Sequence, residues 1–154
     1  MAVIDQVKRF FEIDEWEYAE TEEGLRIKFG GRNGVWDCLS IVREQEGQFL
    51  FLSSAPVTIS PEQYSPVAEY LMRANFGLFI GNFELDFEAG TVQFRTSIDV
   101  EGDEAVLSPL IIKHLVYQNV ITMDKYLPGL SRVLDASASP AAAVYLIESS
   151  TDPD

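Results

Sequence analysis

Three acidic residues recur at every second position after residue 83: Glu84, Asp86 and Glu88. On a strand they would project from one face at steps of roughly 7 Å. Two such carboxylates can hydrolyse a glycosidic bond when one of them lies in a cleft and has a raised pKa. Arg95 is expected to lie opposite Glu84, and this favours a solvated, ion-paired face over a catalytic one.

Other residue types that carry chemistry are scarce in this chain. Cys38 is the only cysteine and His114 the only histidine. They are expected on a strand and on a helix respectively, so no thiol–imidazole nucleophile is predicted. Acidic residues 99–104 surround Gly102, but an EF-hand loop has its glycine sixth and a glutamate twelfth. Here glycine is fourth and Leu110 is twelfth, so we predict no metal ion.

Gly77 and Gly81 could belong to a phosphate-binding loop. Such a loop follows a strand and opens a helix, and it usually carries a Lys with a Ser or Thr. In this chain the order is reversed, because a predicted helix precedes Gly77 and a predicted strand follows Gly81. Gly77 is expected to close the helix in the left-handed conformation. We therefore predict no nucleotide and no other cofactor.

The charge balance restricts the class of partner. The chain of 154 residues has 25 acidic and 11 basic residues, a formal net charge of -14. Nucleic acids and anionic membranes attract basic proteins, so neither is predicted as a partner. A high net charge keeps small proteins dispersed, and it also steers basic partners. No apolar run approaches a membrane span of about 20 residues, and the single cysteine fits a cytoplasmic location.

The periodicity of the first half predicts a helix followed by a meander. Apolar residues recur at helical spacing over residues 2–12. Alternating patterns then predict strands over residues 25–29, 35–44 and 48–54. Asn33-Gly34 lies between the first two strands and is typical of a type I′ turn, in which both central residues have positive φ.

A second helix and a hairpin are predicted next. Ser60 to Gln63 has the pattern of a capping box. Because Pro66 disfavours one uninterrupted helix, a short first turn is expected there, followed by the helix proper from about Ser65 to Asn75. Residues 82–88 and 91–100 alternate as two strands. With a two-residue loop at Ala89-Gly90, three cross-strand pairs are predicted, namely Phe87–Val92, Leu85–Phe94 and Glu84–Arg95.

The last part of the chain is predicted to contain helices and a tail. Ser108-Pro109 starts a third helix that ends near Met123, and a further helix is expected over residues 124–135, bent or restarted at Pro128. Residues 136–143 have the composition of a linker. We therefore predict one α+β domain over residues 2–135, followed by a linker and acidic tail over residues 136–154. Its antiparallel sheet has flanking helices in the order α-βββ-α-ββ-α.

Several residues together resemble the YbjN-like proteins, which have the fold of type III secretion chaperones: Trp16, Pro61, Asn75, Gly81, Phe83, Asp86, Phe94, Arg95 and the stretch 124–128. The resemblance covers residues 2–135. It implies a small acidic cytoplasmic domain that forms dimers and has no catalytic residues. In the secretion chaperones the dimer binds an extended segment of another protein.

The leading hypothesis is a non-enzymatic protein-binding module, chaperone-like or regulatory, that acts as a homodimer and holds an unidentified partner polypeptide. The apolar stripe of the second helix is the candidate interface, because it is wider than one sheet-facing side requires. Its residues are Tyr64, Val67, Tyr70, Leu71 and Ala74. The alternative is a small enzyme or ligand-binding domain that uses the acidic hairpin face or a pocket under the third helix.

Overall fold

The computed structural model describes residues 1–103 and 107–150. Four α-helices, six strands and two short 3-10 helices occur in this part of the chain. In chain order they are α1 (Val3–Ile13), β1 (Ala19–Glu20), β2 (Leu25–Gly30), β3 (Val35–Arg43), η1 (Glu44–Glu46), β4 (Gln48–Thr58), η2 (Pro61–Gln63), α2 (Tyr64–Phe76), β5 (Asn82–Asp86), β6 (Thr91–Asp99), α3 (Pro109–Leu134) and α4 (Pro140–Glu148).

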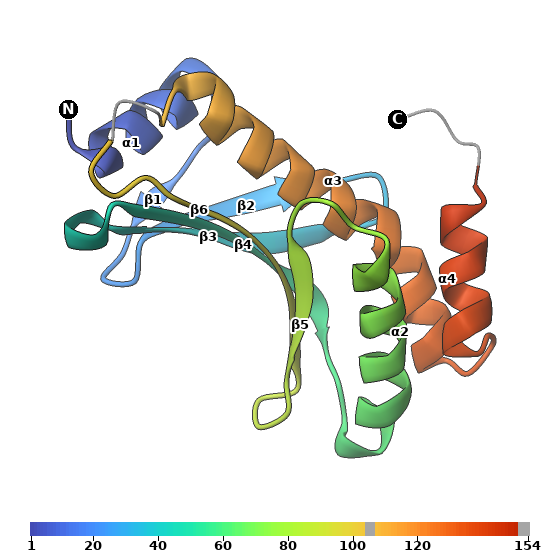
Figure 1. The fold of residues 1–154 in the computed structure, drawn as a ribbon. Helices are drawn as coiled ribbons and strands as arrows, with labels where there is room; N and C mark the ends of the chain where they lie inside the picture. The colour runs from blue at the N-terminus through green and yellow to red at the C-terminus, as the bar shows by residue number, and fades with distance from the viewer. Residues whose placement is uncertain (104–106, 151–154) are drawn as a thin grey trace.

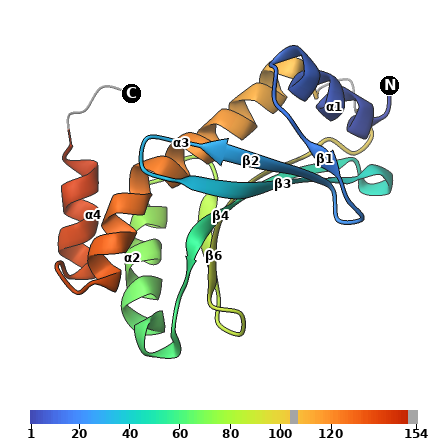
Figure 2. The ribbon, with the colours of Figure 1, turned by 180° about the vertical axis from the view of Figure 1, so that it is seen from behind.

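The strands form one antiparallel sheet in the order β1-β2-β3-β4-β6-β5. Figures 1 and 2 show that β4 and β6 curve strongly and that the helices lie on the outer side of this curve. Among the described residues, no helix lies on the inner face of the sheet. This arrangement confirms the predicted α+β class and the order of its elements from the first helix to the third.

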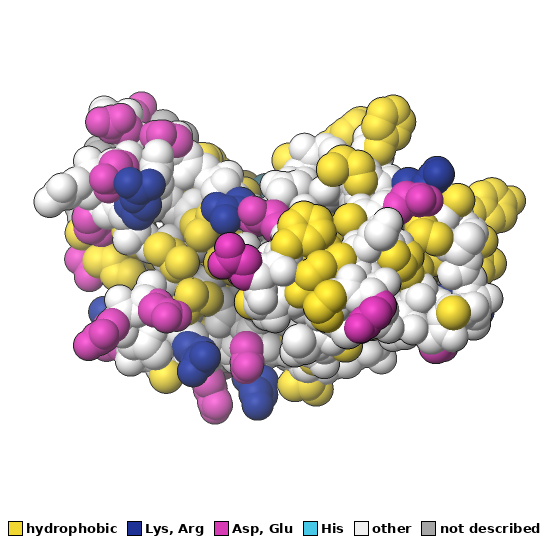
Figure 3. All heavy atoms as spheres, turned by 90° about the horizontal axis from the view of Figure 1, so that it is seen from below, with side chains coloured by type: hydrophobic (Ala, Val, Ile, Leu, Met, Phe, Trp, Pro, Cys, Tyr) yellow, Lys and Arg dark blue, Asp and Glu magenta, His cyan; other side chains and the backbone are white. Residues whose placement is uncertain are grey.

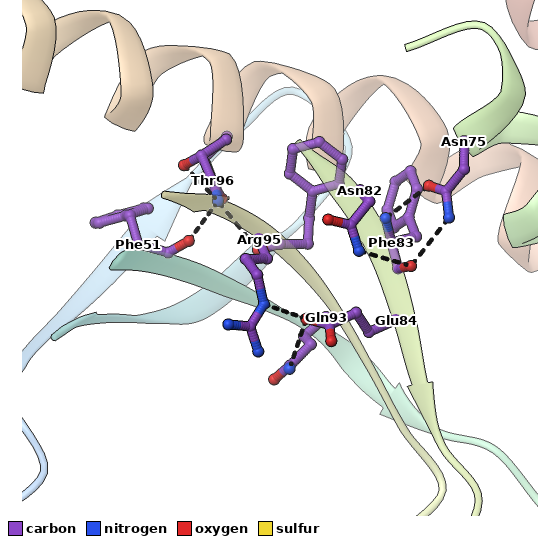
Figure 4. A network of polar contacts seen from close by, with 10 residues as sticks. Phe51, Asn75, Asn82, Phe83, Glu84, Gln93, Arg95 and Thr96 are labelled. Atoms are coloured by element: carbon purple, nitrogen blue, oxygen red, sulfur yellow. Dashed lines mark hydrogen bonds and ion pairs between the residues drawn. The ribbon is translucent and has the colours of Figure 1, made fainter. Parts of the chain in front are cut away.

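The core lies between the helices and the sheet. Alternation places Phe49 and Phe51 of β4 on the covered face, together with Phe94 of β6, and all three are fully buried. Polar side chains also join the helices to the sheet in this layer. Asn119 of α3 donates from Nδ2 to the carbonyl oxygens of Phe51 and Phe94, at 2.8 and 3.0 Å. It therefore ties α3 to the curved part of β4 and β6, close to Thr96 (Figure 4).

The loop between β2 and β3 differs from the predicted type I′ turn. Neither Asn33 nor Gly34 has positive φ, and the loop spans residues 31–34. Its conformation is set from outside by Asp124 of α3, which accepts hydrogen bonds from the backbone N–H groups of Arg32 and Asn33 at 3.1 and 2.8 Å. The sequence pattern describes an isolated turn, whereas this loop is docked on a helix.

The β5–β6 hairpin has a longer loop than predicted. Residues 87–90 form the loop, and Asp86 closes it by accepting hydrogen bonds from the N–H groups of Glu88 and Ala89 at 2.8 and 3.0 Å. Gly90 has a φ of 71°. The predicted two-residue turn at Ala89-Gly90 is therefore wrong, and Phe87 lies in the loop, 60% exposed.

The longer loop shifts the strand register by two residues. Phe83 pairs with Phe94 and Leu85 with Val92, so the predicted Phe87–Val92 and Leu85–Phe94 pairs are wrong. A shift of two residues leaves every side chain on its original face. The apolar face is therefore preserved. Glu84 lies opposite Gln93 and not opposite Arg95 as predicted, but it still forms an ion pair with Arg95 at 2.6 Å (Figure 4).

The second helix begins as predicted. Ser60 and Gln63 form a capping box around η2, and Pro66 lies in the first turn of α2, where its missing N–H has no helical partner to lose. Gly77 does not adopt the predicted left-handed conformation, because its φ is -96°. Gly81 does have positive φ, at 80°.

The predicted break in the third helix is wrong. A single helix, α3, runs from Pro109 to Leu134 and passes through Pro128. Tyr126, Leu127 and Leu130 around the proline are buried. Their burial stabilises helical backbone at a position where local sequence alone disfavours it.

The predicted linker contains a further helix. Ser139 accepts a hydrogen bond from the N–H of Ala142 at 3.2 Å, and α4 follows from Pro140. Ala143 and Val144 are buried, and α4 contacts both α2 and α3. The interpretation of residues 136–143 as a linker is therefore wrong from Pro140 onward. The end of the predicted acidic tail, residues 151–154, lies outside the described residues.

None of the helices in the described part of the chain has the length and hydropathy that a membrane span requires.

Candidate functional site

The three predicted acidic residues do not form one functional face. Glu84 is paired with Arg95, and its carboxylate also accepts a hydrogen bond from Gln93 at 3.2 Å. The N–H of Ala89, followed by that of Glu88, lowers the pKa of Asp86, whereas a catalytic acid needs a raised pKa. Glu88 lies in the loop and not on β5. The arrangement is a salt bridge and a turn cap.

Cys38 and His114 do not form a pair. Cys38 is buried under the helices, and burial raises the pKa of its thiol to about 11, which opposes nucleophilic use. His114 is exposed on α3. Within residues 1–103 and 107–150, no group of three His, Cys, Asp or Glu side chains could hold a metal ion. The acidic stretch 99–104 ends at Glu104, which lies outside the described residues.

Most residues of the predicted interface on α2 are buried within the single chain. Val67, Tyr70, Leu71 and Ala74 are buried, and only Tyr64 is partly exposed. Helix α4 lies against α2, and α3 contacts α1, α2, α4 and the sheet. The buried side chains have no surface to offer to another molecule, so their assignment to an interface is corrected. The apolar surface that suggested it is covered by α3 and α4.

Four exposed apolar residues lie on the last turns of α2 and in the loop that follows it, and we call them the aromatic patch: Met72, Phe76, Phe79 and Ile80. Phe76 is 95% and Phe79 101% exposed. Large exposed apolar patches are rare on soluble monomers, and where they occur they often mark contact sites. Figure 3 shows that hydrophobic side chains also gather over the half of the lower face where α2 and α4 lie, whereas charged side chains concentrate over the other half.

The two edges of the sheet differ in how their backbone groups are used. At the β5 edge, the side chain of Asn75 imitates a neighbouring strand. It accepts a hydrogen bond from the N–H of Phe83 at 2.7 Å and donates one to the Phe83 carbonyl at 3.1 Å (Figure 4). The backbone groups of Phe83 are thereby satisfied by a side chain, a common protection of edge strands.

The β2 edge is open beyond the end of β1. Along an antiparallel ladder, pairs of residues that are hydrogen-bonded to each other alternate with pairs that are not. Gly31 donates a hydrogen bond to the Gly34 carbonyl, so every second residue of β2 counted back from Gly31 bonds to β3. By this alternation Phe29 and Ile27 bond to β3, whereas Lys28 and Gly30 point their backbone groups away from it. Strand β1 pairs only with Leu25 and Arg26. Both Lys28 and Gly30 are exposed.

An apolar depression lies directly beside this open edge. It has a volume of about 420 Å³ between β2 and α3, and its lining includes Phe29, Gly30, Val120 and Ile121. Ile121 is 47% exposed. The ring of Trp16 stacks on Phe29 at a centroid distance of 5.5 Å, which fixes the Phe29 side chain at this edge. The open backbone groups and the depression together form what we call the β2 edge site.

A larger depression of about 610 Å³ lies at the start of α1. The carboxylate of Glu44 lies there, but it accepts hydrogen bonds from the backbone N–H groups of Val3 and Ile4 at 3.2 and 2.6 Å. Glu44 thus acts as a remote cap of α1, and the N-terminal N–H groups that an anion would need are partly occupied.

Comparison with protein families decides the classification. The model of the YbjN family, described as "Putative bacterial sensory transduction regulator", matches residues 4–132. The chain belongs to the YbjN family. A search of curated protein sequences finds no match.

Solved structures agree with this classification at the level of the fold. A crystal structure of YbjN from E. coli has 16% identity and a TM-score of 0.63, with 89% of this chain and 95% of that chain covered. The HopA1–SchA chaperone–effector complex contains a similar chain, with 12% identity, a TM-score of 0.54, and coverages of 80% and 91%. The ExsC–ExsE complex contains another, with 11% identity, a TM-score of 0.53, and coverages of 82% and 91%.

Neither surface of this YbjN-family chain was predicted from sequence. The aromatic patch had a readable signal, because Met72 and Phe76 are four residues apart on the side of α2 opposite Tyr70 and Ala74. The β2 edge site had none. Its exposure depends on where β1 ends and on how α3 crosses the sheet, and both are tertiary properties.

Proposed function

We propose that this protein is a non-enzymatic binding module that holds an extended segment of a partner protein at the β2 edge site. The observation that carries the proposal is the pair of outward-pointing backbone positions, Lys28 and Gly30, next to an apolar depression. Adding a strand to a sheet edge gives affinity through main-chain hydrogen bonds, and pockets for alternate side chains give specificity.

Two further observations support a binding role. A structurally similar chain was solved in the HopA1–SchA chaperone–effector complex, and this supports a role in which a chain of this fold binds another polypeptide. In addition, the carboxylates of the hairpin are engaged in a salt bridge and a turn. The net charge of -14 disfavours nucleic acid and favours a polypeptide as the partner.

The test is selection from an unbiased peptide-display library on the immobilised full chain. We expect enriched peptides whose binding to Ile121→Asp falls at least about tenfold, because the substitution places a charge in the depression. Ile13→Asp is the matched control, since Ile13 is exposed on α1, and it should bind as wild type does. Failure to enrich any peptide would overturn the proposal, as would peptides that bind Ile121→Asp unchanged.

We also propose that two copies associate through the aromatic patch. A two-fold interface places the same residues of both copies in contact, and exposed phenylalanines are typical of such contacts. The patch is bordered by an ion pair between Arg73 and Glu69 at 2.9 Å. In a two-fold contact the Arg73 of one copy can face the Glu69 of the other, so the border is complementary in charge to itself.

Sedimentation of the wild-type chain at about 10–50 μM, well above the dissociation constant of a specific dimer, tests the association. We expect a dimer for wild type and a folded monomer for Phe76→Glu. Leu110→Glu is the control, because Leu110 is also an exposed apolar residue but lies on α3. A wild-type monomer over this range, or a Phe76→Glu dimer, would contradict association through the patch.

A further inference from the structure

We infer that the segment held at the β2 edge site carries an acidic residue directly beside a bulky apolar residue. This inference rests on the proposed function and adds the chemistry of the partner to it. It follows from the direction in which side chains of an added strand must point, and from the side chains that they would meet there.

The direction follows from the alternation of the ladder. A residue paired with Lys28 places its side chain on the same face as the Lys28 side chain. That face is the inner face of the sheet, on which no helix lies in the part of the chain that the structure describes (Figure 1). The adjacent residue of the added strand, beside Phe29, must then point to the opposite face, where α3 lies.

The position beside Phe29 is apolar. The depression there is bounded by Val120 and Ile121 of α3, and Phe29 forms its strand side. Arg32 is the basic residue of the lining. Asp124 is the acidic residue of the lining, but its carboxylate already accepts hydrogen bonds from the loop N–H groups of Arg32 and Asn33. A depression of about 420 Å³ accommodates a large side chain such as leucine, and filling it removes the exposed part of Ile121 from water.

The position beside Lys28 is basic. Arg26 and Lys28 are both exposed and alternate on the inner face of β2. Neither forms an ion pair within residues 1–103 and 107–150. Asp37 pairs with Lys28 on the β3 side, so the opposite side of Lys28 is the one left for a partner. Arg26 is paired with β1, so Lys28 is the cation at the open part of this edge. In a chain of net charge -14, it selects an acidic residue.

The experiment uses four synthetic peptides with the same eight-residue threonine-rich host. Their central dipeptides are Glu-Leu, Gln-Leu, Lys-Leu and Glu-Ala. Binding to the full-length chain is measured by fluorescence anisotropy at about 0.15 M salt, where the field of distant acidic residues is largely screened. We expect Glu-Leu to bind about two- to fivefold more tightly than Gln-Leu, as one exposed ion pair allows, and Lys-Leu to bind more weakly still. Glu-Ala should bind about tenfold or more weakly than Glu-Leu, because its alanine leaves the depression unfilled.

A charge reversal provides the decisive comparison. With Lys28→Glu, the preference should reverse, so that Lys-Leu binds more tightly than Glu-Leu. If the ratio of the two affinities is the same in both proteins, the acidic part of the inference is wrong. If Glu-Ala binds as well as Glu-Leu, the apolar part is wrong.

The proposed function is tested separately from this pattern. Library peptides that require Ile121 but show no preference for an acidic neighbour would retain the function and overturn the inference. Absence of binding for all four peptides, together with enrichment of library peptides at the same site, would also overturn it. Absence of binding in both experiments would overturn the function itself.

Discussion

The side-chain amide of Asn33 donates a hydrogen bond of 2.9 Å to the carbonyl oxygen of Asp124. This carbonyl lies four residues before Pro128, which has no N–H to donate to it. The β2–β3 loop therefore supplies the hydrogen bond that the proline removes from α3, and the Asp124 carboxylate in turn holds the loop. The contact explains how α3 continues through a proline and why the loop has its observed conformation.

A double-mutant cycle tests this relationship. We expect Asn33→Ala to lower the free energy of unfolding by about 1–2 kcal/mol, because it leaves the Asp124 carbonyl without a donor. In a Pro128→Ala background the same change should cost less, since the new N–H can reach that carbonyl. Urea unfolding of the four proteins measures the coupling. Equal costs of Asn33→Ala in both backgrounds would refute the relationship.

The two glycines after α2 should respond differently to alanine. Gly81 has positive φ, and an added Cβ would lie 2.6 Å from the Arg95 carbonyl oxygen. Gly81→Ala should therefore cost at least about 1–3 kcal/mol of stability. Gly77 has ordinary φ, and the nearest atom to an added Cβ is 3.8 Å away, so Gly77→Ala should stay within about 0.5 kcal/mol of wild type. Similar losses in thermal or urea unfolding would be inconsistent with this geometry.

The register of the β5–β6 hairpin can be measured through its phenylalanines. Phe83→Ala and Phe94→Ala should each lower the free energy of unfolding by about 3–5 kcal/mol. Both rings are buried, and their centroids lie 4.7 Å apart. Phe87→Ala should cost less than about 1.5 kcal/mol, because that ring is exposed in the loop and only its edge meets Tyr64. A large loss for Phe87→Ala would favour the two-residue turn instead.

Sequence patterns predicted the elements better than the connections between them. The capping box at Ser60 and the serine cap at Ser108 were predicted correctly, because caps depend on residues three or four positions apart. The register of the hairpin was not, because Asp86 can close a longer turn that the Ala89-Gly90 pattern does not reveal. The continuity of α3 at Pro128 depends on Asn33, which is 91 residues away from Asp124.

Burial of the apolar stripe on α2 is another property that local sequence patterns do not predict. The stripe was correctly seen as apolar, but whether another chain or this chain covers it cannot be decided from periodicity. Ala74→Glu provides the check: Ala74 is fully buried, and a charge there should lower stability by several kcal/mol. Circular dichroism should therefore show an unfolded or strongly destabilised chain. A folded monomer would restore the original assignment of this face to a dimer interface.

Amide hydrogen exchange at Lys28 and Gly30 tests the central claim most directly. Free protein should exchange both amides quickly, because they point away from β3, whereas Phe29 between them should already be protected. Saturation with a library-selected or Glu-Leu peptide should slow amide exchange at Lys28 and Gly30 about tenfold or more, because both amides then form strand hydrogen bonds to the peptide. Unchanged exchange at both amides in the saturated complex would contradict strand addition at β2.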